Sequence, residues 1–272
     1  MVSATAAVVC SDGHLHRDGD LPDGLEVELG LLLGMSPVVH VEPGVLIDEH
    51  AAVLCDAAQV LGYEGAMLAA VTDELHVMLA SASGPSAVAL VPIAAHHRAT
   101  PPGRAWRLQR VAPLAAEPAS PIELVLSPFA RRALPEVASL VLQADAELEA
   151  AAALHPGGAV DPAALLRVDG AGHVARVGDA TVFARVEGQV VTPRLADGAP
   201  RTAWRAALLD GVHETALTPE QLATASSIVC LTPQGTPCAV ASIDGTAVPD
   251  QSLADELDDR LASLRLNAEE QR

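Results

Sequence analysis

Apolar residues recur at helical spacing in two long segments of the chain. Over Ile47–Leu61 they lie three or four positions apart, with Asp48 near the start, and this pattern predicts an amphipathic helix. Leu134–Leu154 repeats the pattern, with Pro135 in the first turn, and a Pro-Gly-Gly stop follows it. Shorter helices are predicted at Trp204–Asp210, after the Thr218-Pro219 cap, and from Ser252 to a fraying polar tail, Asn267–Arg272.

Short apolar runs bounded by turn residues predict strands in both halves of the chain. In the first half the runs are Met1–Cys10, Ala66–Val71, Leu75–Leu79 and Ala87–Val91, and the last three are spaced like hairpins around Thr72-Asp73 and Ser81–Ser86. In the second half they are Ala164–Val168, Val174–Val186, Ala225–Leu231 and Ala239–Ile243. Strands and helices mixed in this way indicate an α+β protein.

A proline-rich stretch, Ala94–Pro121, separates the two halves. It holds five prolines and two basic patches, His96-His97-Arg98 and Arg104–Arg110. Because proline cannot donate a backbone hydrogen bond, such a stretch is typical of a connection between domains. We therefore expect an N-terminal α+β domain over residues 1–112 and a C-terminal α+β domain over residues 113–272.

The composition excludes several classes of partner. Half of the 272 residues are hydrophobic, which is enough for a sizeable core, and the formal net charge is −19 at pH 7. Such a charge argues against binding to nucleic acid or to anionic membrane surfaces. No apolar run reaches the roughly 20 residues that a bilayer span needs, and the N-terminus lacks a secretory signal. We expect a cytoplasmic protein.

Neither the cysteines nor the histidines have the spacing of a metal site. Four cysteines, Cys10, Cys55, Cys230 and Cys238, are expected to be reduced and mostly buried thiols. The pairs His14 with His16 and His96 with His97 lack the third ligand of a catalytic zinc site, so no metal is expected.

Six segments in the second half resemble, in order, motifs of the class IV aminotransferases. They are Asp169–Val174 ("D-x-x-G-x-V"), Gly178–Phe183 ("S-x-N-x-F"), Glu187–Pro193 ("x-G-x-V-x-T-P"), Pro200–Leu208 ("L-P-G-I-T-R" and a helix), Leu217–Ala225 and Ser242–Gly245 ("x-I-D-G"). In the first half, a weaker similarity to motifs of this family is found at Leu32-Leu33-Gly34 and Ile47–His50. The resemblance covers most of the chain and is strong in the second half.

This resemblance implies the two-domain α+β fold of that family, which includes branched-chain and D-amino-acid aminotransferases and aminodeoxychorismate lyases. It also implies a homodimer, because the family builds its clefts at a dimer interface. Members hold pyridoxal phosphate (PLP) as a Schiff base on one lysine, and a Schiff base needs a primary amine.

The chain departs from the family at the residues that hold the cofactor. It contains no lysine, since all sixteen basic residues are arginines, and the guanidinium of arginine cannot replace the amine. Arg176 stands where the family has the glutamate that pairs with the pyridine nitrogen, and Val53 stands where it has a phosphate-binding arginine. The first phosphate-binding turn has lost its glycine and reads Pro200–Trp204; the second persists as Gln234-Gly235-Thr236.

The resemblance places six residues in the old cofactor cleft: Arg176, Thr181, Arg201, Thr202, Arg205 and Thr236. Arginines there suit a carboxylate or phosphate, so we expect a small anionic ligand and no covalently bound cofactor. An alternative interpretation is that these arginines form ion pairs with Asp or Glu residues of this acidic chain. Non-covalent binding of PLP is a less favoured alternative to the absence of a cofactor.

Two other functions stay open at this point. One is a PLP-independent lyase, isomerase or condensing enzyme of a biosynthetic pathway that uses the same cleft. The other is a non-catalytic subunit that pairs with an active paralogue. Neither ordinary transamination nor any named substrate is predicted by the sequence.

Overall fold

The computed structural model describes residues 8–11, 14–17, 36–60, 68–80, 82, 84–92, 106–111, 121–131, 161 and 164–270. Of these, the residues up to Val111 form one compact unit and those from Pro121 onward form another. The predicted domain boundary at residues 112 and 113, the predicted helix Leu134–Leu154 and the pair His96-His97 lie outside the described residues. Among the described helices, none combines the length and the apolar character needed to cross a bilayer.

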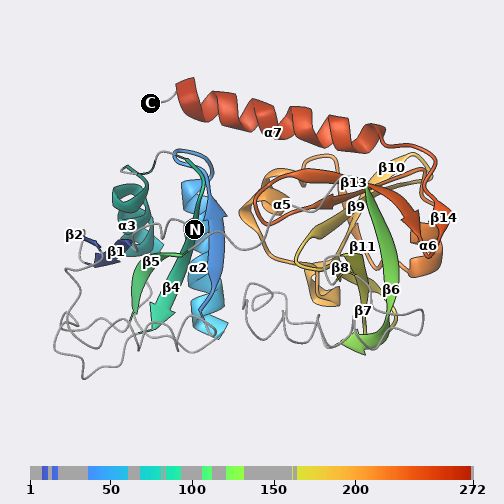
Figure 1. Cartoon of the computed structure of the whole chain (residues 1–272), viewed down its shortest axis with the longest axis horizontal. Coiled ribbons are helices and arrows are strands. Elements are labelled where there is room, and N and C mark those ends of the chain that lie inside the picture. Colours follow the sequence, from blue (N-terminus) through green and yellow to red (C-terminus); the bar gives the residue numbers. More distant parts are fainter. Residues whose placement is uncertain are drawn as a thin grey trace, which may run out of the picture. The chain divides into compact units, whose positions relative to one another are not determined.

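The first unit is an antiparallel sheet with two helices packed on it (Figure 1). Its strand order is β2-β1-β5-β4-β3, from β1 (Val8–Ser11), β2 (His14–Arg17), β3 (Val38–Val41), β4 (Ser86–Pro92) and β5 (Trp106–Val111). The helices are α2 (Ile47–Val60) and α3 (Leu68–Ala80). The predicted helix from Ile47 is confirmed, and its acidic first turn, Asp48 and Glu49, is favourable beside the positive end of the helix dipole.

The prediction of two strands between Ala66 and Leu79 was wrong, because one helix, α3, occupies this segment. Val71, Leu75, Met78 and Leu79 are all buried, and their spacing is that of one helical face. The polar pair Thr72-Asp73 lies on the more exposed side of the helix and does not form a turn. The strand predicted at Ala87–Val91 is confirmed as part of β4.

Strand β5 lies within Ala94–Pro121, the stretch predicted to connect the two domains, so this part of the stretch belongs to the first unit. Strand β5 pairs with β1 on one side and with β4 on the other, so it is the central strand of the sheet. Its fully buried Trp106 and Leu108 alternate with polar residues in the sequence, which is the period of a strand. The prolines around β5 obscured this period.

The second unit is a nine-stranded mixed sheet with the order β11-β10-β9-β12-β13-β6-β7-β8, and β14 pairs with β13. Its strands are β6 (Ile122–Arg131), β7 (Leu165–Asp169), β8 (Val174–Val177), β9 (Thr181–Val186), β10 (Gln189–Pro193), β11 (His213–Thr215), β12 (Ser227–Leu231), β13 (Pro237–Ile243) and β14 (Thr246–Ala247). The sheet curls until β8 contacts β9, where Val177 bridges to Ala180 (Figure 1).

The concave inside of this curled sheet holds a core of small aliphatic side chains. Almost every strand contributes, with Leu166, Val182, Cys230 and Val240 among the buried residues. Helix α6 (Pro219–Ala223) adds Leu222 to the same core. Because side chains alternate along a strand, the neighbours of these residues lie on the outer face of the sheet.

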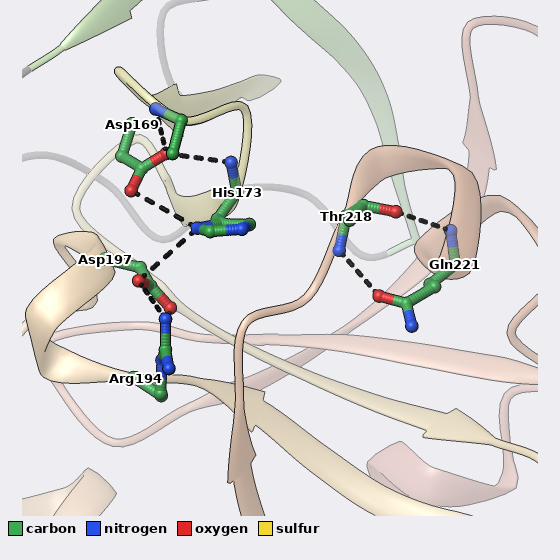
Figure 2. Close-up of polar contacts among 7 residues, drawn as sticks. Asp169, His173, Arg194, Asp197, Thr218 and Gln221 are labelled. Atoms are coloured by element: carbon green, nitrogen blue, oxygen red, sulfur yellow. Dashed lines mark hydrogen bonds and ion pairs between the residues drawn. The ribbon is translucent and has the colours of Figure 1, made fainter.

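The short helices of this unit begin where the sequence predicted. Thr218 and Gln221 form a reciprocal capping box at α6, with Pro219 in the first turn (Figure 2). Thr202 caps α5 (Ala203–Ala207) by accepting a hydrogen bond from the backbone of Arg205. The last helix, α7 (Ser252–Glu270), includes residues 267–270, the described part of the tail that was expected to fray.

Helix α7 packs on β12 and β13. Phe183, Trp204 and three leucines of α7, Leu253, Leu257 and Leu261, are fully buried. Arg265 of α7 lies over the Trp204 ring, with its guanidinium carbon 5.2 Å from the ring centroid. A Cβ placed on Gly235 would lie 2.7 Å from Trp204, so the indole packs directly on the glycine backbone.

We predict that Gly235→Ala destabilises the second unit through this contact. Gly235 has a φ of +80°, and the added methyl group would also collide with the Trp204 ring. Positive φ costs roughly 1–2 kcal/mol and overpacking about 1–3 kcal/mol more. The control is Gly211→Ala, since Gly211 has a φ of +71° and a Cβ added there would meet no heavy atom within 4 Å. Thermal unfolding of both variants measures the difference; equal losses would contradict close packing of Trp204 on Gly235.

Candidate functional site

Two buried arginines face each other on the outer face of the curled sheet. Arg167 of β7 and Arg176 of β8 are paired across the hairpin, and they are only 7% and 5% exposed. Their neighbours Leu166 and Val177 point into the core, which places both arginines on the opposite face. Like charges directly opposite each other in a sheet are destabilising, so this pair needs negative charge nearby.

Asp179 is the carboxylate that couples to both arginines. It lies in the turn between β8 and β9. Burial raises the pKa of Asp179, while attraction to Arg176 and to Arg167 opposes that rise. Its Oδ1 atom is buried and accepts no hydrogen bond from the described residues. Both guanidinium groups therefore attract the charge of this one buried carboxylate.

Thr181 extends the same outer face by one strand. It opens β9, pairs with Leu231 of β12, and precedes Val182, which points into the core. Thr181 is 1% exposed, and its hydroxyl has no hydrogen-bond partner among the described residues. A buried hydroxyl without a partner costs free energy, and such groups call for an explanation. Arg176, Thr181 and the newly found Arg167 therefore bring buried polar groups together on one face.

The other predicted cleft residues serve different roles in the structure. Thr202 is the cap of α5, and Arg205 donates to the backbone oxygen of Pro193 and forms an ion pair with Glu214. The backbone of Thr236 closes a turn with Thr232 before β13. Arg201 is exposed. Thr202 and Arg205 thus have local structural partners. For Arg205 this is the alternative given by the sequence, in which an arginine pairs with an acidic residue of the chain.

The thiols and the helical histidine are not poised for catalysis. Cys55, Cys230 and Cys238 are free and buried, as predicted. Burial raises the pKa of Cys55 to about 11 and raises that of Cys230 further from its ordinary range. Burial lowers the pKa of His50 to about 3, with a further contribution from His40, so the imidazole is neutral at physiological pH.

A second polar group lies at the turn between β7 and β8. Asp169, His173 and Asp197 place one ligand atom each within 4.8 Å of one another. Asp169 and His173 belong to the first family-like motif, but Asp197 comes from the 3₁₀ helix η3 (Leu195–Asp197), so sequence spacing could not have joined them. Among the described residues, this is the group with the makeup of a metal site.

No family model and no curated protein matches the chain at the sequence level. Solved structures do match. The PLP form of the branched-chain amino acid aminotransferase from Thermobaculum terrenum is 13% identical, with a TM-score of 0.72 over 95% of this chain and 93% of that one. The 4-amino-4-deoxychorismate lyase from Pseudomonas aeruginosa is 21% identical, with a TM-score of 0.67 over 94% and 98%.

The branched-chain amino acid aminotransferase from Escherichia coli gives a similar result, with 17% identity and a TM-score of 0.68 over 93% of this chain and 92% of that one. Identities this low establish architecture and leave chemistry to the residues. The expected mixed α+β architecture is confirmed: this chain has the fold of the class IV aminotransferases.

Proposed function

We propose that this chain is a class IV aminotransferase-fold protein that has lost PLP Schiff-base chemistry and binds a small anionic molecule. The ligand site is the outer face formed by Arg167, Arg176 and Thr181. The buried, opposed arginine pair is the observation that carries the proposal.

The residues at the old cofactor positions do not fit PLP. No lysine is present to form the Schiff base. Bound PLP supplies an electron sink, which depends on a protonated pyridine nitrogen, and a nearby carboxylate favours that proton. Arg176, which stands at the matching position, would instead repel the proton through its own charge.

Trp204 adds a steric argument against the cofactor. The resemblance assigns phosphate to two turns, Pro200–Trp204 and Gln234–Thr236. The fully buried indole of Trp204 packs on the backbone of Gly235, and so it joins the two turns directly. A phosphate group bound by both turns would therefore compete with the indole ring for the space against Gly235.

The same face has the properties of an anion site. Two guanidinium groups offer forked hydrogen-bond donors in a buried setting, where charge-assisted hydrogen bonds to a carboxylate or phosphate are strong. The hydroxyl of Thr181, buried and without a partner among the described residues, supplies a neutral donor beside them. A bound anion would be attracted by both guanidinium groups, as the carboxylate of Asp179 is.

Replacement of Arg176 by glutamine is expected to weaken binding of sulfate, which serves as the probe anion. Losing one charge-assisted hydrogen bond costs about 1.5–3 kcal/mol, or roughly a ten- to hundredfold rise in the dissociation constant. Calorimetric titration at constant ionic strength measures the change. Arg185→Gln is the matched control, because Arg185 also lies on the sheet but forms an ion pair with Glu256. Equal effects of the two substitutions, or no binding to the unchanged protein, would contradict the proposal.

Replacement of Asp179 by asparagine is expected to have the opposite effect and tighten sulfate binding several-fold. The variant removes the carboxylate that competes with the ligand for both arginines. Since the pKa of Asp179 is raised on folding, ionisation of its side chain destabilises the folded state above that pKa, and this penalty is absent at low pH. Sulfate affinity of the unchanged protein should therefore rise as the pH falls, and that of the variant should not. Weaker binding by the variant at neutral pH would be the contrary outcome.

A further inference from the structure

Three side chains from two segments of the second unit converge at the β7–β8 hairpin (Figure 2). Asp169 ends β7, His173 lies just before β8, and Asp197 ends η3. The Nδ1 atom of His173 lies 3.5 Å from Oδ2 of Asp169 and 3.6 Å from Oδ1 of Asp197. Figure 2 shows the imidazole between the two carboxylates.

Both carboxylates are held in place by contacts that do not involve the imidazole. Oδ1 of Asp169 accepts hydrogen bonds from the backbone N–H groups of Ala171 and His173, each at 2.8 Å. Arg194 donates two hydrogen bonds, of 2.9 and 2.8 Å, to the carboxylate of Asp197. The site is therefore preorganised, because its ligand atoms do not have to be gathered when a partner binds.

The two distances from His173 are too long for hydrogen bonds and suit a shared metal ion. Hydrogen bonds from N–H to O range from about 2.7 to 3.2 Å. Ligand atoms bound at about 2.0–2.2 Å to a tetrahedral metal lie roughly 3.3–3.6 Å apart. Nδ1 of His173 is itself buried and has no hydrogen-bond partner among the described residues. The orphaned nitrogen is thus aimed at the point between two oxygens where a cation would sit.

Charge favours a cation at the same point. The side chains of Asp169 and Asp197 are 12% and 4% exposed, so their charges are poorly screened by water. Arg194 balances one of them, but its own side chain is 46% exposed and its charge is screened more strongly. With a neutral imidazole, these four side chains carry one negative charge in excess.

We propose that Asp169, His173 and Asp197 form a binding site for a divalent transition-metal ion of the zinc class. Oδ2 of Asp169, Nδ1 of His173 and Oδ1 of Asp197 are the ligands, and imidazole with carboxylate is a donor set that such ions accept. The His173 side chain is 28% exposed, so the site lies near the protein surface. This site does not depend on the proposed anion site, because it uses other residues and another ligand.

Cobalt(II) titration of the full chain, without a histidine tag, tests the site. Cobalt(II) in a low-symmetry site of nitrogen and oxygen ligands has visible absorption bands, and zinc should displace it. The expected result is one equivalent bound, with the bands lost and affinity lowered at least tenfold in both His173→Gln and Asp197→Asn. His213→Ala is the control, because His213 is an exposed histidine of β11 and is not one of the three proposed ligands; this variant should retain full binding.

One variant removes the imidazole ligand and the other a carboxylate ligand, so the test still works if one of them does not fold. Circular dichroism shows whether each variant is folded. Asp169 is left unchanged, since its other oxygen holds the turn through two backbone hydrogen bonds. Absence of a cobalt spectrum in the unchanged protein would overturn the proposal. So would a spectrum that survives both folded variants. Either result would mean that these three side chains do not form a metal site.

Discussion

Two guanidinium groups buried opposite each other cannot be stable without negative charge nearby, and this constraint organises one face of the second unit. Arg167 and Arg176 meet it in part through Asp179, which sits in the turn that leads into β9. Burial disfavours the ionised form of that aspartate, whereas attraction to the two arginines favours it. The small anion that we propose as the ligand would add negative charge on this face, where the hydroxyl of Thr181 is buried without a partner among the described residues.

The sequence resemblance assigns a Schiff-base lysine, a carboxylate and two glycine-containing turns to the family, whereas this chain has no lysine, has Arg176 at the position assigned to the carboxylate, and packs Trp204 on Gly235. The architecture rests on other residues, namely the aliphatic core inside the curled sheet and the buried leucines of α7. A shared fold therefore leaves the chemistry to be decided by the residues of the site.

The sequence predicted those helices that are encoded by residues close together in the chain. Helix α2 follows from its apolar period, and α6 follows from the capping box of Thr218 with Gln221. Helix α3 and strand β5 were missed because the competing signals were also local: a polar pair suggested a turn inside α3, and prolines surrounded β5. For both elements the short sequence pattern was compatible with two structures, and only the burial of the side chains in the folded unit distinguishes them.

The site depends on features that the sequence does not display. Counting back from the Asp169-Gly170 turn pairs Val168 with Val174, and unbroken pairing would then place Arg167 opposite Ala175. A β-bulge shifts the register by one residue, so that Arg167 faces Arg176 instead. Likewise, Asp197 reaches Asp169 and His173 only through the tertiary position of η3. Arg176 and Thr181 were found through the family resemblance, and Arg167 and Asp179 needed the structure.

The absorbance spectrum of the protein mixed with PLP, recorded before and after borohydride, tests the loss of Schiff-base chemistry most directly. An internal aldimine has its own absorption band, and borohydride reduces it to a stable covalent adduct. The account predicts the spectrum of free PLP and no reduced adduct on any internal residue, because the sole primary amine of a lysine-free chain is its α-amino group. An aldimine band that borohydride traps within the folded chain would contradict it.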